Sequence, residues 1–139
     1  MGTEMRWTPE LATGNSVVDA EHQQLIALIN KLELVGNGPN GTGVEEALDE
    51  LTDYVFVHFQ MEEKLMRREG YPPKQLEAHL AQHRKLDETT QEWVEQYTNG
   101  TLTTVEPIVR FLYAWFWDHI SIVDRAMAEF IRTRHAQPE

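Results

Sequence analysis

The sequence predicts an all-α fold: an antiparallel, up-down-up-down four-helix bundle with an extended N-terminal arm. Apolar side chains recur every three or four residues through four long stretches, which is the period of a helix that buries one face. Short connections rich in glycine, asparagine and proline separate these stretches, as is typical of antiparallel neighbours. The sequence shows no strand pattern and no internal repeat, and 139 residues are enough to bury a core as one domain.

The first half of the chain is expected to hold the arm and two helices. Residues 1–18 include proline and glycine and are expected to form the arm, and the first helix follows over about 19–35. The segment GNGPNGTG is too rich in glycine and asparagine to be helical, so it connects the first helix to the second. Thr42 is the expected N-cap of the second helix, and Glu45 completes a capping box three residues later.

The second half is expected to hold the other two helices. EGYPP ends the second helix, and Pro73 can occupy the first turn of the third. TNGTLT forms the last connection, after which Thr104 is the expected N-cap of the fourth helix and Pro107 lies in its first turn. The bundle is therefore predicted over 19–134, with a C-terminal tail over 135–139.

The charge of the chain limits its partners. It carries 12 basic and 23 acidic residues, a net charge of −11, and this balance disfavours binding to nucleic acid or to an anionic membrane. The N-terminal residues MGTEMRW have no apolar signal-peptide stretch, and no segment approaches the roughly 20 apolar residues that span a bilayer. We therefore expect a cytoplasmic protein without membrane insertion. An acidic surface with no evident exposed apolar stripe also favours a monomer.

Five of the six histidines fall on inward helical positions, and two carboxylates join them. The set is His22, His58, Glu62, His79, His83, His119 and Asp124. Residues four apart lie about one helical turn apart, so His58 with Glu62, and His79 with His83, each direct two donors at a common point. A carboxylate in a core costs several kcal/mol without a partner, and metal ions would remove that cost.

Imidazole and carboxylate are ligands that suit iron, zinc, manganese and copper, and the chain has no cysteine to offer a thiolate. Seven ligands are too many for one tetrahedral zinc, and the two carboxylates can bridge, so we predict a two-metal centre inside the bundle. The sixth histidine, His135, lies in the expected tail and is not predicted to be a ligand.

His119 and Asp124 are five residues apart, which does not suit a regular helix. Five residues at about 100° each leave two side chains near 140° apart, so they would point in different directions. A one-residue insertion in the helix, a π-bulge, would bring both to the same metal pair, and such bulges concentrate at functional sites. We therefore predict a π-bulge in this segment.

These residues together resemble the hemerythrin family. The family pattern is a histidine on the first helix, HFxxEE on the second, HxxxH on the third and HxxxxD on the fourth, and every element is present here in order. The resemblance implies that His22 and His58 bind the iron that takes up oxygen. It implies that the other iron is held by His79, His83 and His119. Glu62 and Asp124 would then bridge the two iron ions (Fe2+/Fe3+), together with an oxo or hydroxo group.

The resemblance implies reversible dioxygen binding by a carrier, a store or a supplier to an oxygen-consuming enzyme, and not an enzyme. A ferritin-like di-iron oxidase usually shows two Glu-x-x-His motifs, and none occurs here. An iron-handling or nitric-oxide-handling protein would use the same ligands and stays open as an alternative. A sensor is less expected, because nothing in this sequence is fused to the domain to receive a signal. Metal-bound histidines usually donate their other N–H to a carboxylate or carbonyl, and Glu21, beside His22, is the expected acceptor.

Overall fold

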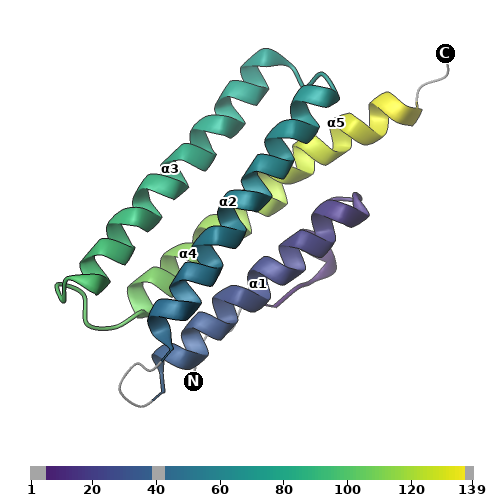
Figure 1. Cartoon of the computed structure of the whole chain (residues 1–139). Coiled ribbons are helices and arrows are strands. Elements are labelled where there is room, and N and C mark those ends of the chain that lie inside the picture. Colours follow the sequence, from purple (N-terminus) through teal and green to yellow (C-terminus); the bar gives the residue numbers. More distant parts are fainter. Residues whose placement is uncertain (1–5, 39–42, 137–139) are drawn as a thin grey trace.

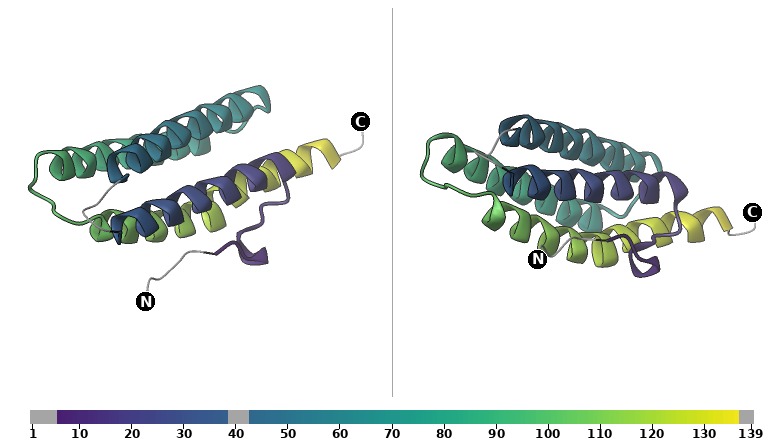
Figure 2. Two further views of the ribbon diagram at one scale, coloured as in Figure 1. Left: turned by 60° about the horizontal axis from the view of Figure 1, so that its bottom comes forward. Right: turned by 90° about the horizontal axis from the view of Figure 1, so that it is seen from below.

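The computed structural model describes residues 6–38 and 43–136, and within these ranges the regular structure is helical (Figure 1). Its long helices are α1 (Ser16–Gly36), α2 (Val44–Arg68), α3 (Pro73–Thr98), α4 (Glu106–Asp118) and α5 (Arg125–Ala136). A π-helix, His119–Asp124, joins α4 to α5, so these three elements form the single fourth helix of the bundle. Figure 2 shows α2 and α3 in one layer and α1 with α4 and α5 in the other. The predicted four-helix bundle is confirmed.

Two apolar clusters divide the interior along its length. The larger contains Leu25, Leu51, Leu86 and Leu112, and the smaller contains Val18, Met66, Met127 and Ile131. The inward histidines and carboxylates lie where the two clusters meet: on α1 His22 lies between Val18 and Leu25, and on the fourth helix Asp124 lies between Ile120 and Met127. The polar centre is thus closed off by apolar packing at both ends. No helix among residues 6–38 and 43–136 is both long and apolar enough to cross a membrane.

The N-terminal arm ends earlier than predicted and is only partly extended. Helix α1 begins at Ser16, three residues before the expected start, because the Asn15 side chain accepts hydrogen bonds from the backbone N–H groups of Val17 and Val18. Upstream, a short 3₁₀ turn places Leu11 in the core with no exposed surface. The Arg125 guanidinium donates to backbone carbonyls of the arm, which holds the arm against the fourth helix.

The starts of the second and fourth helices differ from the side-chain caps predicted for them. Thr42 lies outside the described residues, and α2 begins at Val44 after Gly43, whose φ of 87° is in the left-handed region that favours glycine. Thr104 does not cap the fourth helix: α4 begins at Glu106, its N-cap is Val105, and no side chain caps it. Val105 is buried in the core, so the start of this helix is held by packing rather than by a side-chain cap.

The C-terminal helix extends beyond the predicted end of the bundle. Helix α5 runs to Ala136, so His135 belongs to a helix and not to a tail. The His135 Nε2 lies 2.8 Å from both carboxylate oxygens of Glu69, and Arg134 donates to the Glu69 carbonyl. These contacts attach the end of α5 to the end of α2.

Candidate metal centre

The π-helix predicted between His119 and Asp124 is present and covers those six residues. The wider turn adds one residue, so both side chains face the interior although they are five apart. Only 2% of His119 and none of Asp124 is exposed. Ile122, in the same segment, is 65% exposed, which is where the added residue is accommodated.

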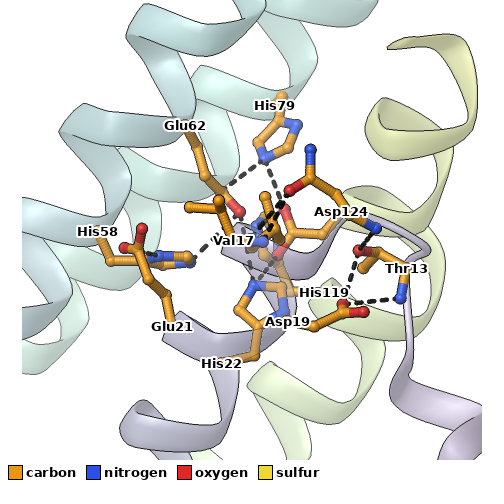
Figure 3. A network of polar contacts seen from close by, with 12 residues as sticks. Thr13, Val17, Asp19, Glu21, His22, His58, Glu62, His79, His119 and Asp124 are labelled. Atoms are coloured by element: carbon orange, nitrogen blue, oxygen red, sulfur yellow. Dashed lines mark hydrogen bonds and ion pairs between the residues drawn. The ribbon is translucent and has the colours of Figure 1, made fainter. Parts of the chain in front are cut away.

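All seven predicted ligands converge in the middle of the bundle, and Figure 3 labels each of them except His83. They come from every helix of the bundle, and none is more than 3% exposed. Their ligand atoms form two overlapping groups, within each of which the atoms lie within 4.8 Å of one another. We name them the two-histidine cluster, which contains His22 and His58, and the three-histidine cluster, which contains His79, His83 and His119. Glu62 and Asp124 belong to both.

Each shared carboxylate turns one oxygen toward each cluster. Glu62 Oε2 lies 3.5 Å from His22 Nε2 and 3.3 Å from His58 Nε2. Its other oxygen, Oε1, lies 3.4 Å from His79 Nε2 and 3.2 Å from His83 Nε2. The two oxygens of one carboxylate therefore face two different groups of imidazoles, which is the arrangement of a bridging ligand.

Asp124 divides its oxygens in the same way. Asp124 Oδ2 lies 2.9 Å from His22 Nε2, in the two-histidine cluster. Asp124 Oδ1 lies 3.1 Å from His79 Nε2 and 3.2 Å from His119 Nε2, in the three-histidine cluster. Both carboxylates are thus placed to contact two cations at once.

Most of the ligand atoms in the two clusters lack a hydrogen-bond partner. The atoms in question are both carboxylate oxygens of Glu62 and Asp124, both ring nitrogens of His22 and His79, and Nε2 of His58. A buried polar atom without a partner costs about 1–3 kcal/mol, and more if it is charged. Such a group of buried acceptors fits metal ions, which would bind them all together.

Three histidines are oriented by polar side chains behind them, and each of those side chains comes from the neighbouring helix. Glu21 Oε1 accepts from His58 Nδ1 at 3.0 Å, so the expected contact of Glu21 with an imidazole is present, but to His58 and not to its neighbour His22. Gln82 Oε1 accepts from His119 Nδ1 at 2.8 Å. The third contact is longer, 3.4 Å from His83 Nδ1 to Glu63 Oε2.

These outer contacts determine which ring nitrogen is free. When Nδ1 carries the proton, Nε2 presents a lone pair to the centre. His83 Nε2 and His119 Nε2 lie only 3.3 Å apart. With Nδ1 protonated on both rings, two lone pairs face each other, and a cation between them removes the repulsion. The outer contacts therefore orient the rings for metal binding.

Without metal, the same charges shift the pKa values of the buried groups. Burial alone would lower the pKa of His58, but the charge of Glu62, the hydrogen bond to Glu21 and the close contact with Glu62 raise it to about 10. Burial is outweighed at His79 too, where contacts with Asp124 and Glu62 raise the pKa to about 9. Burial would raise the pKa of Glu62, yet the surrounding histidines hold it well below its usual value. The carboxylates thus stay ionised and draw positive charge into the centre.

Two aromatic rings pack flat against imidazoles of the three-histidine cluster. Phe59 is stacked on His83, with ring centroids 3.7 Å apart and planes 6° from parallel. Trp115 is stacked on His119 at 4.3 Å and 17°. These rings restrict the orientation of the two imidazoles from the side of the larger apolar cluster.

The sixth histidine is not in the centre. His135 is mostly exposed on α5 and contacts Glu69, so it belongs to neither cluster. Glu63 and Gln82 were not predicted from the sequence. The available signal was their position, since each directly follows or precedes a predicted ligand, as Glu21 does.

Comparisons with known proteins agree with this geometry. Residues 13–131 match the family model described as the hemerythrin HHE cation binding domain. A bacteriohemerythrin of Methylococcus capsulatus is 31% identical over 122 residues, covering 87% of this chain and 92% of that protein. A bacteriohemerythrin of Pseudomonas aeruginosa is 28% identical over 126 residues, covering 91% and 80%. A crystal structure of wild-type hemerythrin has a TM-score of 0.84 at 30% identity and covers 91% of this chain and 97% of that one. The chain therefore belongs to the hemerythrin family.

Proposed function

We propose that this chain holds two bridged iron ions and binds dioxygen reversibly, as a carrier, a store or a supplier to an oxygen-consuming enzyme. The observation that carries the proposal is the division of the Glu62 and Asp124 oxygens between two groups of imidazoles. In this assignment His22 and His58 hold one iron, and His79, His83 and His119 hold the other. A pair of ferrous ions supplies the two electrons that dioxygen takes up on binding and returns on release.

The protein's part is to offer unequal donor sets. One cluster provides three imidazoles and the other two, while the carboxylates serve both. The two-histidine cluster therefore leaves one more coordination position for an external ligand. Apolar side chains beyond both ends of the centre exclude water, which favours a small neutral ligand over a hydrated ion.

We propose a binding role and not catalysis. Besides the seven ligands, the buried polar or charged residues of the described chain are Thr13, Glu69 and Thr90. Glu69 is engaged with His135 at the end of α5, and Thr13 hydrogen-bonds Asp19 in the arm. None of these offers an acid or base to a substrate held by the two clusters. Cytoplasmic location and an enzyme partner stay predictions.

The test is the visible spectrum of the iron-loaded, reduced protein while oxygen is admitted and then removed. We expect an absorption band that appears with oxygen, disappears on its removal and returns over repeated cycles. One-way oxidation that no removal of oxygen reverses would instead support an oxidase or an iron-handling protein. The Glu62→Ala variant should show no band, because it lacks an oxygen donor in each cluster.

A further inference from the structure

Helix α2 carries a charged stripe on its outer face, opposite the metal centre. The α2 stripe comprises Glu46, Glu50, Asp53, Val57, Gln60, Lys64 and Arg68, all of them exposed. At about 100° per residue these seven positions fall within an arc of about 80°, so they form a continuous line along the helix. In Figure 1 this helix lies between α1 and α3.

The charges of the α2 stripe are ordered along the helix. Its first three residues are acidic, Val57 lies at the middle, and Lys64 and Arg68 are at the far end. Glu50 pairs with Lys31 at 3.3 Å, but neither cation of the stripe has an ion-pair partner in the described part of the chain. Two unpaired cations on one helix are notable in a chain with 23 acidic and only 12 basic residues.

The middle of the α2 stripe is apolar and flanked by hollows. Val57 is 59% exposed and Phe56, beside it, is 57% exposed. A hollow of about 560 Å³ between α1 and α2 is lined by residues that include Val17, Val57 and Met61. A second hollow, of about 210 Å³, lies between α2 and α3 beside Phe56. A surface with protruding apolar side chains next to hollows can fit a second copy of itself, because the protrusions of one copy can enter the hollows of the other.

We infer that the α2 stripe is the interface of a two-fold symmetric dimer of this chain, with Val57 at the axis and the two α2 helices antiparallel. In such an interface the same surface meets itself, so a residue at 57 plus n lies opposite the partner's residue at 57 minus n. Lys64 then lies opposite Glu50 of the partner subunit, and Arg68 lies opposite Glu46 of the partner subunit. The order of charges along the stripe is therefore self-complementary, and Phe56 and Val57 are covered at its centre.

The dimer is expected to be weak and to depend on concentration. Exposed ion pairs contribute about 0.2–1 kcal/mol each, and two chains of net charge −11 repel one another. At physiological ionic strength that repulsion is screened beyond about 8 Å, whereas pairs in contact keep most of their attraction. The monomer expected from the sequence depended on the absence of an exposed apolar stripe, and the exposure of Phe56 and Val57 argues against it.

Complementary charge reversals test the inference in the metal-loaded chain by analytical ultracentrifugation. Lys64→Glu with Arg68→Glu makes the stripe wholly acidic, and Glu46→Lys with Glu50→Lys makes its charged ends basic. We expect the unmodified chain to dimerise as its concentration rises. The dimer dissociation constant of each double variant should be at least tenfold higher, and an equal mixture of the two variants should form a heterodimer. An unmodified chain that stays monomeric at millimolar concentration, or a mixture that fails to associate, overturns the inference.

Two controls separate the interface from general charge and folding effects. Lys74→Glu with Lys85→Glu changes the net charge equally on the exposed part of α3, and it should leave the association intact. The chain has no cysteine, so Val57→Cys introduces a single thiol that should form a disulfide between two copies under mild oxidation. Leu34→Cys, on α1 and 73% exposed, should cross-link much more slowly. Equal cross-linking at the two positions would mean that Val57 is not at a dimer axis.

Discussion

The two clusters of the metal centre share both carboxylates, yet their imidazoles are held differently. In the three-histidine cluster, His83 and His119 are each stacked on an aromatic ring, and each contacts a polar side chain through Nδ1. In the two-histidine cluster, His22 and His58 meet edge to face at 4.9 Å, and no aromatic ring of the described residues is stacked on either of them. The cluster with more donors is also the one whose rings are more tightly packed.

This difference assigns separate tasks to the two clusters. A metal in the cluster of three imidazoles, two of them stacked on aromatic rings, would have little freedom to change its ligands, whereas a metal held by two imidazoles would have room to accept another ligand. The shared carboxylates would connect two bound metals, so a change at one metal would alter the charge felt at the other. Variants that alter both clusters should therefore lose the most iron. Variants that alter one cluster should lose less, and variants that alter the outer contact of one imidazole should lose the least.

Removing a shared carboxylate should have the largest effect. Glu62→Ala takes an oxygen donor from each cluster and leaves five buried imidazoles with one carboxylate, so we expect loss of both iron ions. Asp124→Ala should do the same. Iron analysis of the purified variants measures this, and His135→Ala is the control that should keep two iron ions per chain. A Glu62→Ala protein that retains both irons would show that the carboxylates do not bridge.

Removing one histidine should separate the clusters. His119→Ala leaves the three-histidine cluster with two imidazoles and two carboxylates, the same donors that the other cluster has, so both irons should remain. His58→Ala leaves only one imidazole beside the carboxylates, so we expect about one iron per chain, since three protein ligands of which two are shared hold a metal weakly. Iron analysis after dialysis against a mild chelator distinguishes the two. The comparison between the clusters would be wrong if His119→Ala lost more iron than His58→Ala.

Deleting one residue tests whether the π-helix is a one-residue insertion, and the expected loss of stability is small. Deleting Ile122, which is 65% exposed, removes the added residue and restores a regular helix without rotating the segments on either side. We expect a destabilisation of at most about 1 kcal/mol, the scale of a typical tolerated change. Thermal unfolding followed by circular dichroism measures it.

A matched deletion makes that measurement interpretable. Ala114 is exposed in regular α4, and removing it rotates every following residue by about 100° against the bundle. His119 and Asp124 would leave the interior together, so this variant should lose its iron and most of its stability. If the two deletions reduce stability and iron content equally, the π-helix is not a local one-residue insertion that can be removed without disturbing the bundle.

The sequence predicted the convergence of the seven side chains and the π-helix for one physical reason. Whether a side chain points inward depends only on helical periodicity, which is local, and five-residue spacing between two inward residues requires an added residue. The contacts of Gln82 and Glu63 were not predicted, because they point sideways toward the next helix. Such contacts depend on which helices are adjacent and on how each is rotated. The same limit applies to Thr104, since the residue at the N-cap of α4 is Val105, which is buried between helices.

The outer contacts should change only how tightly one metal is held, and should act on one cluster. Glu21 contacts His58 at 3.0 Å and is the only polar side chain within the described residues that accepts from an imidazole of the two-histidine cluster through Nδ1. Loss of such a contact typically weakens metal binding about 10–100-fold, so Glu21→Ala should weaken the binding of one iron by that factor. Glu21→Gln keeps an acceptor oxygen and should recover most of the affinity.

Glu63→Ala supplies the matched comparison in the three-histidine cluster. Its contact with His83 is longer, 3.4 Å, and Phe59 also holds that ring, so we expect a weaker effect than for Glu21→Ala. Competition with a chelator measures both affinities, and Glu88→Ala on the exposed part of α3 controls for the loss of one surface charge. Equal losses for Glu21→Ala and Glu63→Ala would mean that aromatic packing does not distinguish the clusters. If Glu21→Ala loses much more iron affinity than Glu63→Ala, the two-histidine cluster depends on its single outer carboxylate, because no stacked ring among the described residues holds His58 in its place.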